Sequence, residues 1–244
     1  MGNRVWVLWG LVLAASPALA TTMCANATLA SYIGQNSSGG CQLGNAIFSN
    51  FQYNDVVSGG DPNDPVVPNT DVMISTGGPL TSPSLTFTTV NLAWQATGGF
   101  HNQITLSYTV TALGSSPIQG SSTELSGTVQ NLGGLPSSVS GVYDFFFNST
   151  ETSQSGMLVP SDCGAGATTC ADTGSSGSGL GPTTQVTIGD LITLDSGGSN
   201  GSSPNEATLT QLQQTVSESP EPSTMAATGL GLLAGWFAMR RLRG

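Results

Sequence analysis

The chain has 244 residues, with 4 Lys+Arg against 14 Asp+Glu and a formal net charge of -10. The basic residues are Arg4, Arg240, Arg241 and Arg243, so no lysine or arginine occurs between the two ends. This distribution excludes nucleic-acid binding by phosphate neutralisation, and also nucleotide chemistry that depends on a phosphate-binding lysine or arginine.

The N-terminus has the pattern of a secretory signal peptide. Arg4 precedes an apolar run from Val5 to Ala15, and Ala18 and Ala20 form a small-x-small cleavage site before Thr21. The apolar run is shorter than a typical membrane-spanning helix. We therefore expect export through the Sec translocon and cleavage by signal peptidase after Ala20, with a permanent N-terminal anchor as the alternative.

Four cysteines follow in the exported part: Cys24, Cys41, Cys163 and Cys170. An even number of cysteines in a secreted chain predicts two disulfides, for which three connectivities are possible. Proximity in the sequence favours Cys24 with Cys41 and Cys163 with Cys170, and a loop of the first size would contribute about 3 kcal/mol to stability. Zinc is the alternative, but paired C-x-x-C spacing is absent and His101 is the only histidine.

Alternation of apolar and polar residues indicates one β-rich domain over residues 21–218. The clearest strand runs from Ile104 to Ala112, and Leu85–Phe87 and Leu92–Trp94 are separated by a phase shift near Thr89-Val90 that suggests a bulge. Further strands are expected over Ala46–Tyr53, Thr123–Leu132, Val139–Phe147 and Gln185–Leu194. The pattern predicts an all-β fold, an antiparallel β-sandwich that is jelly-roll-like in its strand count.

Four segments of this domain depart from the strand pattern. Residues 161–182 and 196–205 are rich in Gly and Ser and are expected to form flexible loops. Thr28–Ile33 and Ala207–Val216 are each expected to be able to form a short helix.

Few residues of the domain are candidates for catalysis. His101 lies in the turn before the strongest strand, and no Gly-x-Ser-x-Gly elbow accompanies it. Carboxylate pairs are available, but any acidic β-protein offers such pairs by chance. The sequence therefore predicts that the protein is not an enzyme and has no catalytic residues or cofactor, with a secreted hydrolase as an alternative.

Asp61, Asn63 and Asp64, with Asp71 downstream, form the densest acidic cluster. Hard oxygen ligands of this kind suit Ca²⁺, but the spacing of an EF-hand is absent. Because Asp-Pro and Asn are ordinary turn residues, we expect a turn stiffened by proline, with a calcium site as the alternative.

Aromatic residues bear on carbohydrate binding, because sugar-binding β-sandwiches commonly present flat aromatic faces. Trp94 is the only tryptophan outside the two ends, and both Trp94 and Tyr108 alternate in phase with aliphatic neighbours, which indicates core positions. Tyr53 and Tyr143 could contribute to a binding surface. A carbohydrate-binding module for an exopolysaccharide is therefore the main alternative to a structural role.

The C-terminal residues 219–244 contain three consecutive elements. A Pro-Glu-Pro tripeptide precedes an uncharged stretch from Ser223 to Met239, which is near the lower length limit of a membrane helix. The closing arginines would stay on the cytoplasmic side of the membrane. The stretch is thus expected to insert into the membrane, with a plain single-span anchor as the alternative to a sorting signal.

This tail resembles the PEP-CTERM sorting signal of exported bacterial proteins. The resemblance covers residues 219–243 and includes the Gly229–Leu233 run and the arginines Arg240, Arg241 and Arg243. One departure is Ser219, which stands where a valine often precedes the tripeptide. The sorting motif itself consists of Pro220, Glu221, Pro222, Ser223 and Thr224.

The resemblance implies a partner and a destination. The partner is exosortase, a membrane-embedded cysteine protease and presumed transpeptidase that recognises the Pro-Glu-Pro region and removes the tail. The destination is the cell surface or extracellular matrix, reached through a transient inner-membrane intermediate, commonly beside exopolysaccharide. The expected role is structural and associated with biofilm.

Overall fold

The computed structural model describes residues 22–58, 66–114, 116–130, 137–147, 150–158, 169–197 and 205–219. For Ser58 and residues 138–181, only the backbone is described within these ranges. The predicted signal peptide, the predicted sorting tail from Pro220 onward and Cys163 lie outside the described residues.

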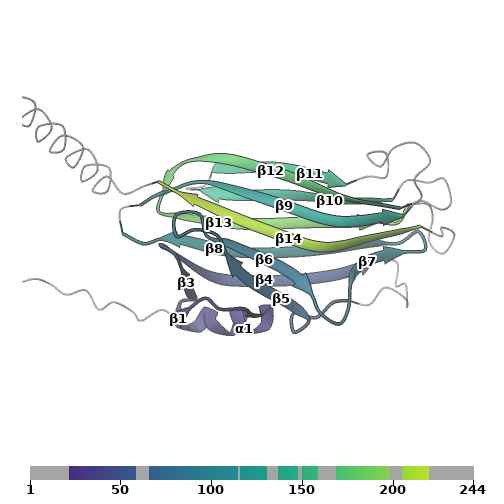
Figure 1. Cartoon of the computed structure of the whole chain (residues 1–244), viewed down its shortest axis with the longest axis horizontal. Helices are drawn as coiled ribbons and strands as arrows, with labels where there is room; N and C mark the ends of the chain where they lie inside the picture. Colours follow the sequence, from purple (N-terminus) through teal and green to yellow (C-terminus); the bar gives the residue numbers. More distant parts are fainter. Residues whose placement is uncertain are drawn as a thin grey trace, which may run out of the picture.

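The described chain folds into two β-sheets whose long strands run along the long axis of the molecule (Figure 1). The first sheet has the order β1-β3-β4-β8-β13-β10-β11, and the second has the order β12-β9-β14-β6-β5-β2, with β7 also paired to β14. β1 pairs with β3 in parallel, and every other described pairing is antiparallel. The antiparallel β-sandwich is therefore confirmed, while its jelly-roll-like strand order stays a prediction.

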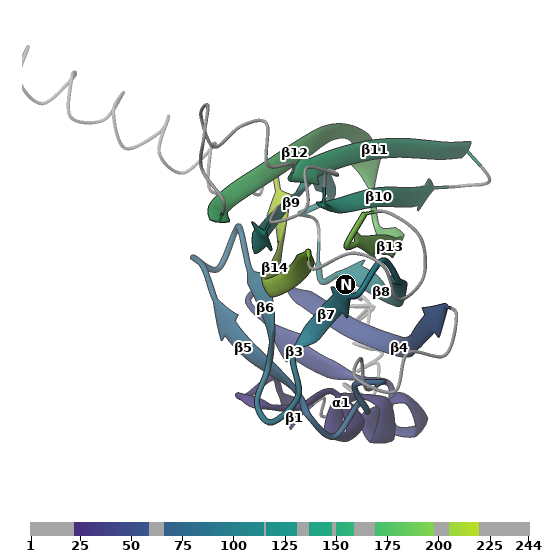
Figure 2. The ribbon, with the colours of Figure 1, turned by 90° about the vertical axis from the view of Figure 1, so that its right-hand side faces the viewer.

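The strand bounds are β1 (Thr22–Met23), β2 (Ala27–Thr28), β3 (Cys41–Leu43), β4 (Ala46–Ser58), β5 (Val72–Gly77), β6 (Ser84–Thr89), β7 (Trp94–Thr97), β8 (His101–Ala112), β9 (Ile118–Gln130), β10 (Ser138–Phe147), β11 (Thr150–Leu158), β12 (Thr169–Thr183), β13 (Gln185–Asp195) and β14 (Glu206–Glu218). Two short helices, α1 (Leu29–Gly34) and the 3-10 helix η1 (Gln35–Ser38), lie at one side of the sandwich (Figure 2). The helix expected over Thr28–Ile33 is thus confirmed as α1.

The hydrophobic core lies between the two sheets. On β8, Ile104, Leu106 and Tyr108 are buried while the alternate residues Gln103 and Thr105 are exposed. The Tyr108 ring meets Phe87 of the opposite sheet with ring centroids 6.2 Å apart. Burial of these alternating apolar faces is the main term that stabilises the sandwich.

Two segments form strands where the sequence indicated other structure. The Gly/Ser-rich segment expected to be a loop belongs to β12 from Thr169 onward, because its backbone pairs with β9 from Thr169 to Gly179. These ladder hydrogen bonds outweigh the low strand propensity of Gly and Ser. The segment Ala207–Val216, expected to be able to form a helix, lies in β14 between β9 and β6.

The position of the bulge also differs from the prediction. β6 ends at Thr89 and β7 begins at Trp94, so the predicted bulge is a turn between two strands. A bulge lies instead in β4, where the pairing with β8 shifts between Ser49 and Gln52 and Asn50 has a φ of 56°.

The side chain of Asn36 in η1 fills the bulge of β4. Its amide nitrogen donates to the carbonyl oxygen of Phe51 and its amide oxygen accepts from the Phe51 N–H, both at 2.9 Å. The asparagine side chain therefore satisfies the two backbone groups that the bulge removes from the ladder. Phe51 then packs edge-on against Tyr32 of α1, with ring centroids 5.1 Å apart.

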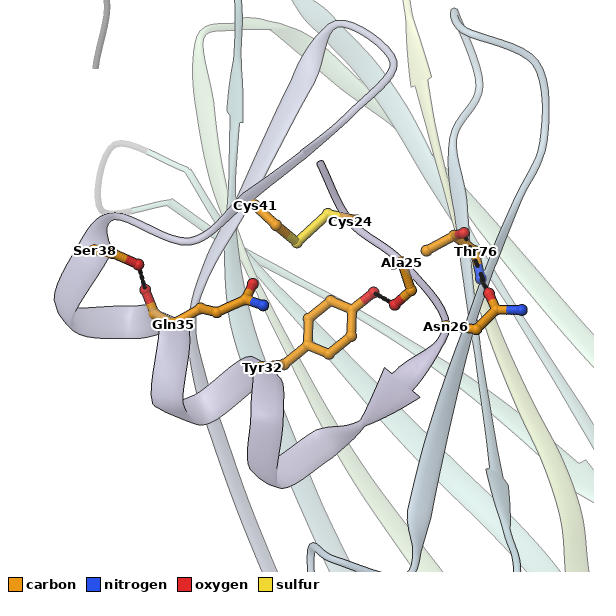
Figure 3. The surroundings of a disulfide bond; sticks show 8 residues. All are labelled: Cys24, Ala25, Asn26, Tyr32, Gln35, Ser38, Cys41 and Thr76. Atoms are coloured by element: carbon orange, nitrogen blue, oxygen red, sulfur yellow. Dashed lines mark hydrogen bonds between the residues drawn. A yellow bond between two sulfur atoms is a disulfide. The ribbon is translucent and has the colours of Figure 1, made fainter. Parts of the chain in front are cut away.

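The disulfide between Cys24 and Cys41 ties the N-terminal segment to β3 (Figure 3). Beside it, the Tyr32 hydroxyl donates to the carbonyl oxygen of Ala25 at 2.9 Å. The first predicted disulfide is confirmed. The second stays a prediction, since Cys163 lies outside the described residues and only the backbone of Cys170 is described.

Gly40 and Gly34 offer a matched pair of alanine substitutions. Gly40 has a φ of +89°, and a Cβ there would overlap the carbonyl oxygen of Phe48, whereas a Cβ at Gly34 meets nothing within 4 Å. We expect Gly40→Ala to lower the free energy of unfolding by at least about 2 kcal/mol and Gly34→Ala to raise it by about 0.5 kcal/mol. Urea unfolding at pH 7 measures both. Equal effects of the two substitutions would contradict the described backbone at Gly40.

Candidate functional site

One end of the first sheet holds a buried carboxyl group, that of Asp55 near the end of β4. The side chain is 6% exposed, and its Oδ2 accepts from the Val67 N–H at 2.8 Å. The Tyr53 hydroxyl donates to the carbonyl oxygen of Val67 at 3.0 Å and accepts from Trp94 Nε1 at 2.9 Å. Asp55 and Tyr53 therefore hold both backbone polar groups of Val67.

Burial raises the pKa of Asp55 to about 6, while the Val67 N–H and the Asn102 side chain act in the opposite direction. Burial also raises the pKa of Tyr53, whose hydroxyl keeps its proton at all physiological pH values. Asp55 can thus exchange a proton near neutral pH. Among the described residues, no group of three or more His, Cys, Asp or Glu side chains is arranged to hold a metal ion.

His101 is the first residue of β8, not a turn residue as predicted, and its Nδ1 lies 3.2 Å from Oδ1 of Asp195 at the end of β13. Backbone register places Ser58 of β4 on the other side of His101. The His101 and Asp195 side chains are 46% and 35% exposed. The His101–Asp195 pair is therefore partly open to water.

The core positions predicted for Trp94 and Tyr108 are confirmed. Both side chains are buried, and Tyr32 of α1 is buried as well. Tyr53 is half-buried and its hydroxyl is held by two hydrogen bonds, while the Tyr143 side chain is not described. None of the Trp and Tyr side chains that the structure describes therefore forms an exposed platform.

A stripe of three buried polar residues, Thr123, Asp190 and Gln214, lies between the sheets and was not predicted from the sequence. Gln214 of β14 donates through Nε2 to Oδ1 of Asp190 on β13, and the Thr123 hydroxyl of β9 donates to Gln214 Oε1 at 2.9 Å. All three side chains are buried. Burial and the nearby Asp190 carboxylate raise the pKa of Tyr108. The signal in the sequence was the inward phase of these residues, since Asp190 lies between the buried residues Ile188 and Ile192.

Several predicted site residues lie outside the described residues: the calcium candidates Asp61, Asn63 and Asp64, the cleavage-site residues Ala18, Ala20 and Thr21, the sorting motif Pro220 to Thr224, and the arginines Arg240, Arg241 and Arg243. Asp71 is described, and its Oδ1 accepts from the Asn91 side chain at 2.9 Å. In the described part of the chain, no helix has the length and apolar character needed to cross a membrane.

No protein family and no curated protein matches the chain. Among solved structures, the enzymatically active domain of bacteriophage CBA120 tailspike protein 4 has a TM-score of 0.28 at 9% identity, covering 66% of this chain and 19% of that one. TmCBM61 in complex with β-1,4-galactotriose has a TM-score of 0.29 at 9% identity, covering 67% and 86%. A carbohydrate-binding module of the β-sandwich superfamily has a TM-score of 0.24 at 11% identity, covering 81% and 61%. The chain thus spans under a fifth of the tailspike domain, and likenesses this distant carry no argument about function.

Proposed function

We propose that the protein is an exported, non-enzymatic β-sandwich that exosortase releases from the inner membrane to the cell surface or extracellular matrix, where it has a structural, biofilm-associated role. The positions of the first and last described strands support this proposal. The first strand begins at Thr22, next to the predicted cleavage site at Ala20, and β14 ends at Glu218, next to the Pro-Glu-Pro tripeptide. The described strands fit between the two predicted processing sites.

The way the chain leaves the domain supports a removable tail. β14 is an inner strand, and the N–H groups of Glu218 and Ser219 donate to the carbonyl oxygens of Thr81 and Pro117, both at 2.9 Å. Cleavage between Pro220 and Thr224 would leave all these hydrogen bonds in place. The domain would therefore stay folded after its tail is removed, as a secreted product requires.

The described polar side chains support a non-enzymatic role. His101 and Asp195 are open to water, and Asp55 and Asp190 are engaged with Val67 and Gln214 in the interior. The acidic, lysine-free domain also carries charge of one sign, which opposes self-association and keeps an exported protein in solution.

The test is the intact mass and the location of the protein in its own bacterium, compared between the wild type and a strain that lacks the exosortase. We expect a mass that starts at Thr21 and ends between Pro220 and Thr224, found outside the cell only when the protease is present. A variant with Pro220→Ala, Glu221→Ala and Pro222→Ala should stay in the inner membrane of the wild-type strain. A mass that still includes Arg240 to Gly244 in both strains contradicts the proposal.

A further inference from the structure

A shallow cavity of about 250 Å³ opens between β4 and β8 in the first sheet. We call it the β4–β8 groove; its lining residues are Gln52, Tyr53, Asn54, Thr105 and Ser107. Gln52, Asn54 and Thr105 are exposed and Ser107 is partly exposed, whereas the intervening residues of both strands turn toward the core. The groove therefore lies on the outer face of the sheet.

The register of the strands explains the hollow. Gln52 of β4 pairs with Ser107 of β8, and Ser107 pairs with Gly189 of β13. Serine has a short side chain and glycine has none, so the outer surface of the sheet is hollowed at this row of paired residues. In the next row, Asn54 and Thr105 stand side by side and rise higher. The bulge of β4 ends at Gln52 and so lies directly beside the groove.

The groove offers hydrogen bonds that the protein itself does not use. Within the described part of the chain, none of the side chains of Gln52, Asn54, Thr105 and Ser107 has a hydrogen-bond partner. Two amides and two hydroxyls provide both donors and acceptors without a formal charge. The hydroxyl of Tyr53 points to the inner side, where it is bound to Trp94 and Val67, and this fixes the strand between the two amides.

Aliphatic side chains flank these polar groups. Val56 is 47% exposed on the same face of β4, and Leu191 of β13 is the register neighbour of Thr105. A sugar ring carries hydroxyls at its edge and C–H groups on its faces, so polar groups beside aliphatic ones suit it. Small-molecule sites generally combine such apolar surface with a few placed polar groups.

The negative charge of the protein favours a neutral sugar over an acidic one as the ligand of the groove. The chain has a net charge of -10, and its basic residues all lie at the two ends. An acidic polysaccharide would meet repulsion here and find no cation to neutralise it. We propose that the β4–β8 groove binds a neutral glycan through Gln52, Asn54, Thr105 and Ser107.

The test is calorimetric titration of the full-length chain in a detergent without a sugar head group, with dextran, a β-1,3-glucan and a β-1,4-galactan as neutral probes and alginate as the acidic one. We expect at least one neutral probe to bind more tightly than alginate. The double variant Gln52→Ala and Asn54→Ala should raise its Kd at least about ten-fold, because two hydrogen-bonding groups are lost. Ser107→Trp, which fills the hollow and keeps both amides, should raise it by a similar factor.

Gln185→Ala is the matched control. Gln185 is the exposed first residue of β13 in the same sheet, and it pairs with Thr111 of β8. It should leave the Kd within about two-fold of the wild-type value. Absence of binding by every neutral probe, preference for alginate, or unchanged affinity of the double variant would each overturn the proposal. Binding is measured on purified protein, so its failure is distinct from a failure of exosortase processing.

Discussion

Replacing Gln214 with leucine is expected to lower the free energy of unfolding by about 3 kcal/mol, because it removes a donor from a buried carboxylate. Gln214 links Asp190 of the first sheet to Thr123 of the second, and all three side chains are buried. Leucine has a similar size but can neither donate to Asp190 nor accept from Thr123. Urea unfolding at pH 7 measures the loss.

Gln213→Leu is the control, because Gln213 is the neighbouring residue of β14 on its less buried face. It should change the free energy of unfolding by less than about 0.5 kcal/mol. Adding Asp190→Asn to Gln214→Leu should recover part of the loss, since the buried group no longer carries a charge. If the Gln214 and Gln213 variants unfold at the same urea concentration, the stripe does not stabilise the sandwich.

Unbroken alternation made two strands, β8 and β13, easy to predict from the sequence. β8 and β13 bury every second residue over most of their length, so their patterns were sufficient. Ala207–Val216 in β14 was expected to be able to form a short helix, and the register of β14 with β9 shifts between Leu209 and Gln211. The shift leaves Leu209 and Leu212 both buried three residues apart, which is the spacing of neighbours on a helix face.

The polar sites were less predictable, because each depends on how strands are paired. Asp55, Asp190 and Gln214 occupy inward phases, but alternation within one strand does not tell which residue of the opposite sheet will face them. The β4–β8 groove likewise depends on the register that brings Ser107 and Gly189 together. The sequence of β12 shows almost no alternation of apolar and polar residues, because Gly and Ser indicate neither an inward-facing nor an outward-facing position.

Asp55 should make the protein more stable in mild acid than at neutral pH. Burial raises its pKa in the folded state to about 6 from the ordinary value of 3.8, so the folded state holds the proton more tightly than the unfolded state. The stabilisation is complete below about pH 4 and is lost as the pH rises through about 6, with a total near 3 kcal/mol for a shift of about two pH units. Burial raises the pKa of Glu218 as well, so the direction is the same there.

The Asp55→Asn variant separates the contribution of Asp55 to the pH dependence of stability from the contributions of other titratable groups. The amide stays neutral at every pH and its oxygen can still accept from the Val67 N–H, so the variant should gain about 3 kcal/mol relative to the wild type between pH 4 and pH 7. Urea unfolding of both proteins across this range measures the gain, and parallel profiles would show that Asp55 does not titrate in the interior. The Glu218→Gln variant measures how much of the remaining pH dependence of stability comes from Glu218. Protonation in mild acid also lowers the net charge of -10, so reduced repulsion should stabilise both proteins equally, and their difference reports the buried carboxyl alone.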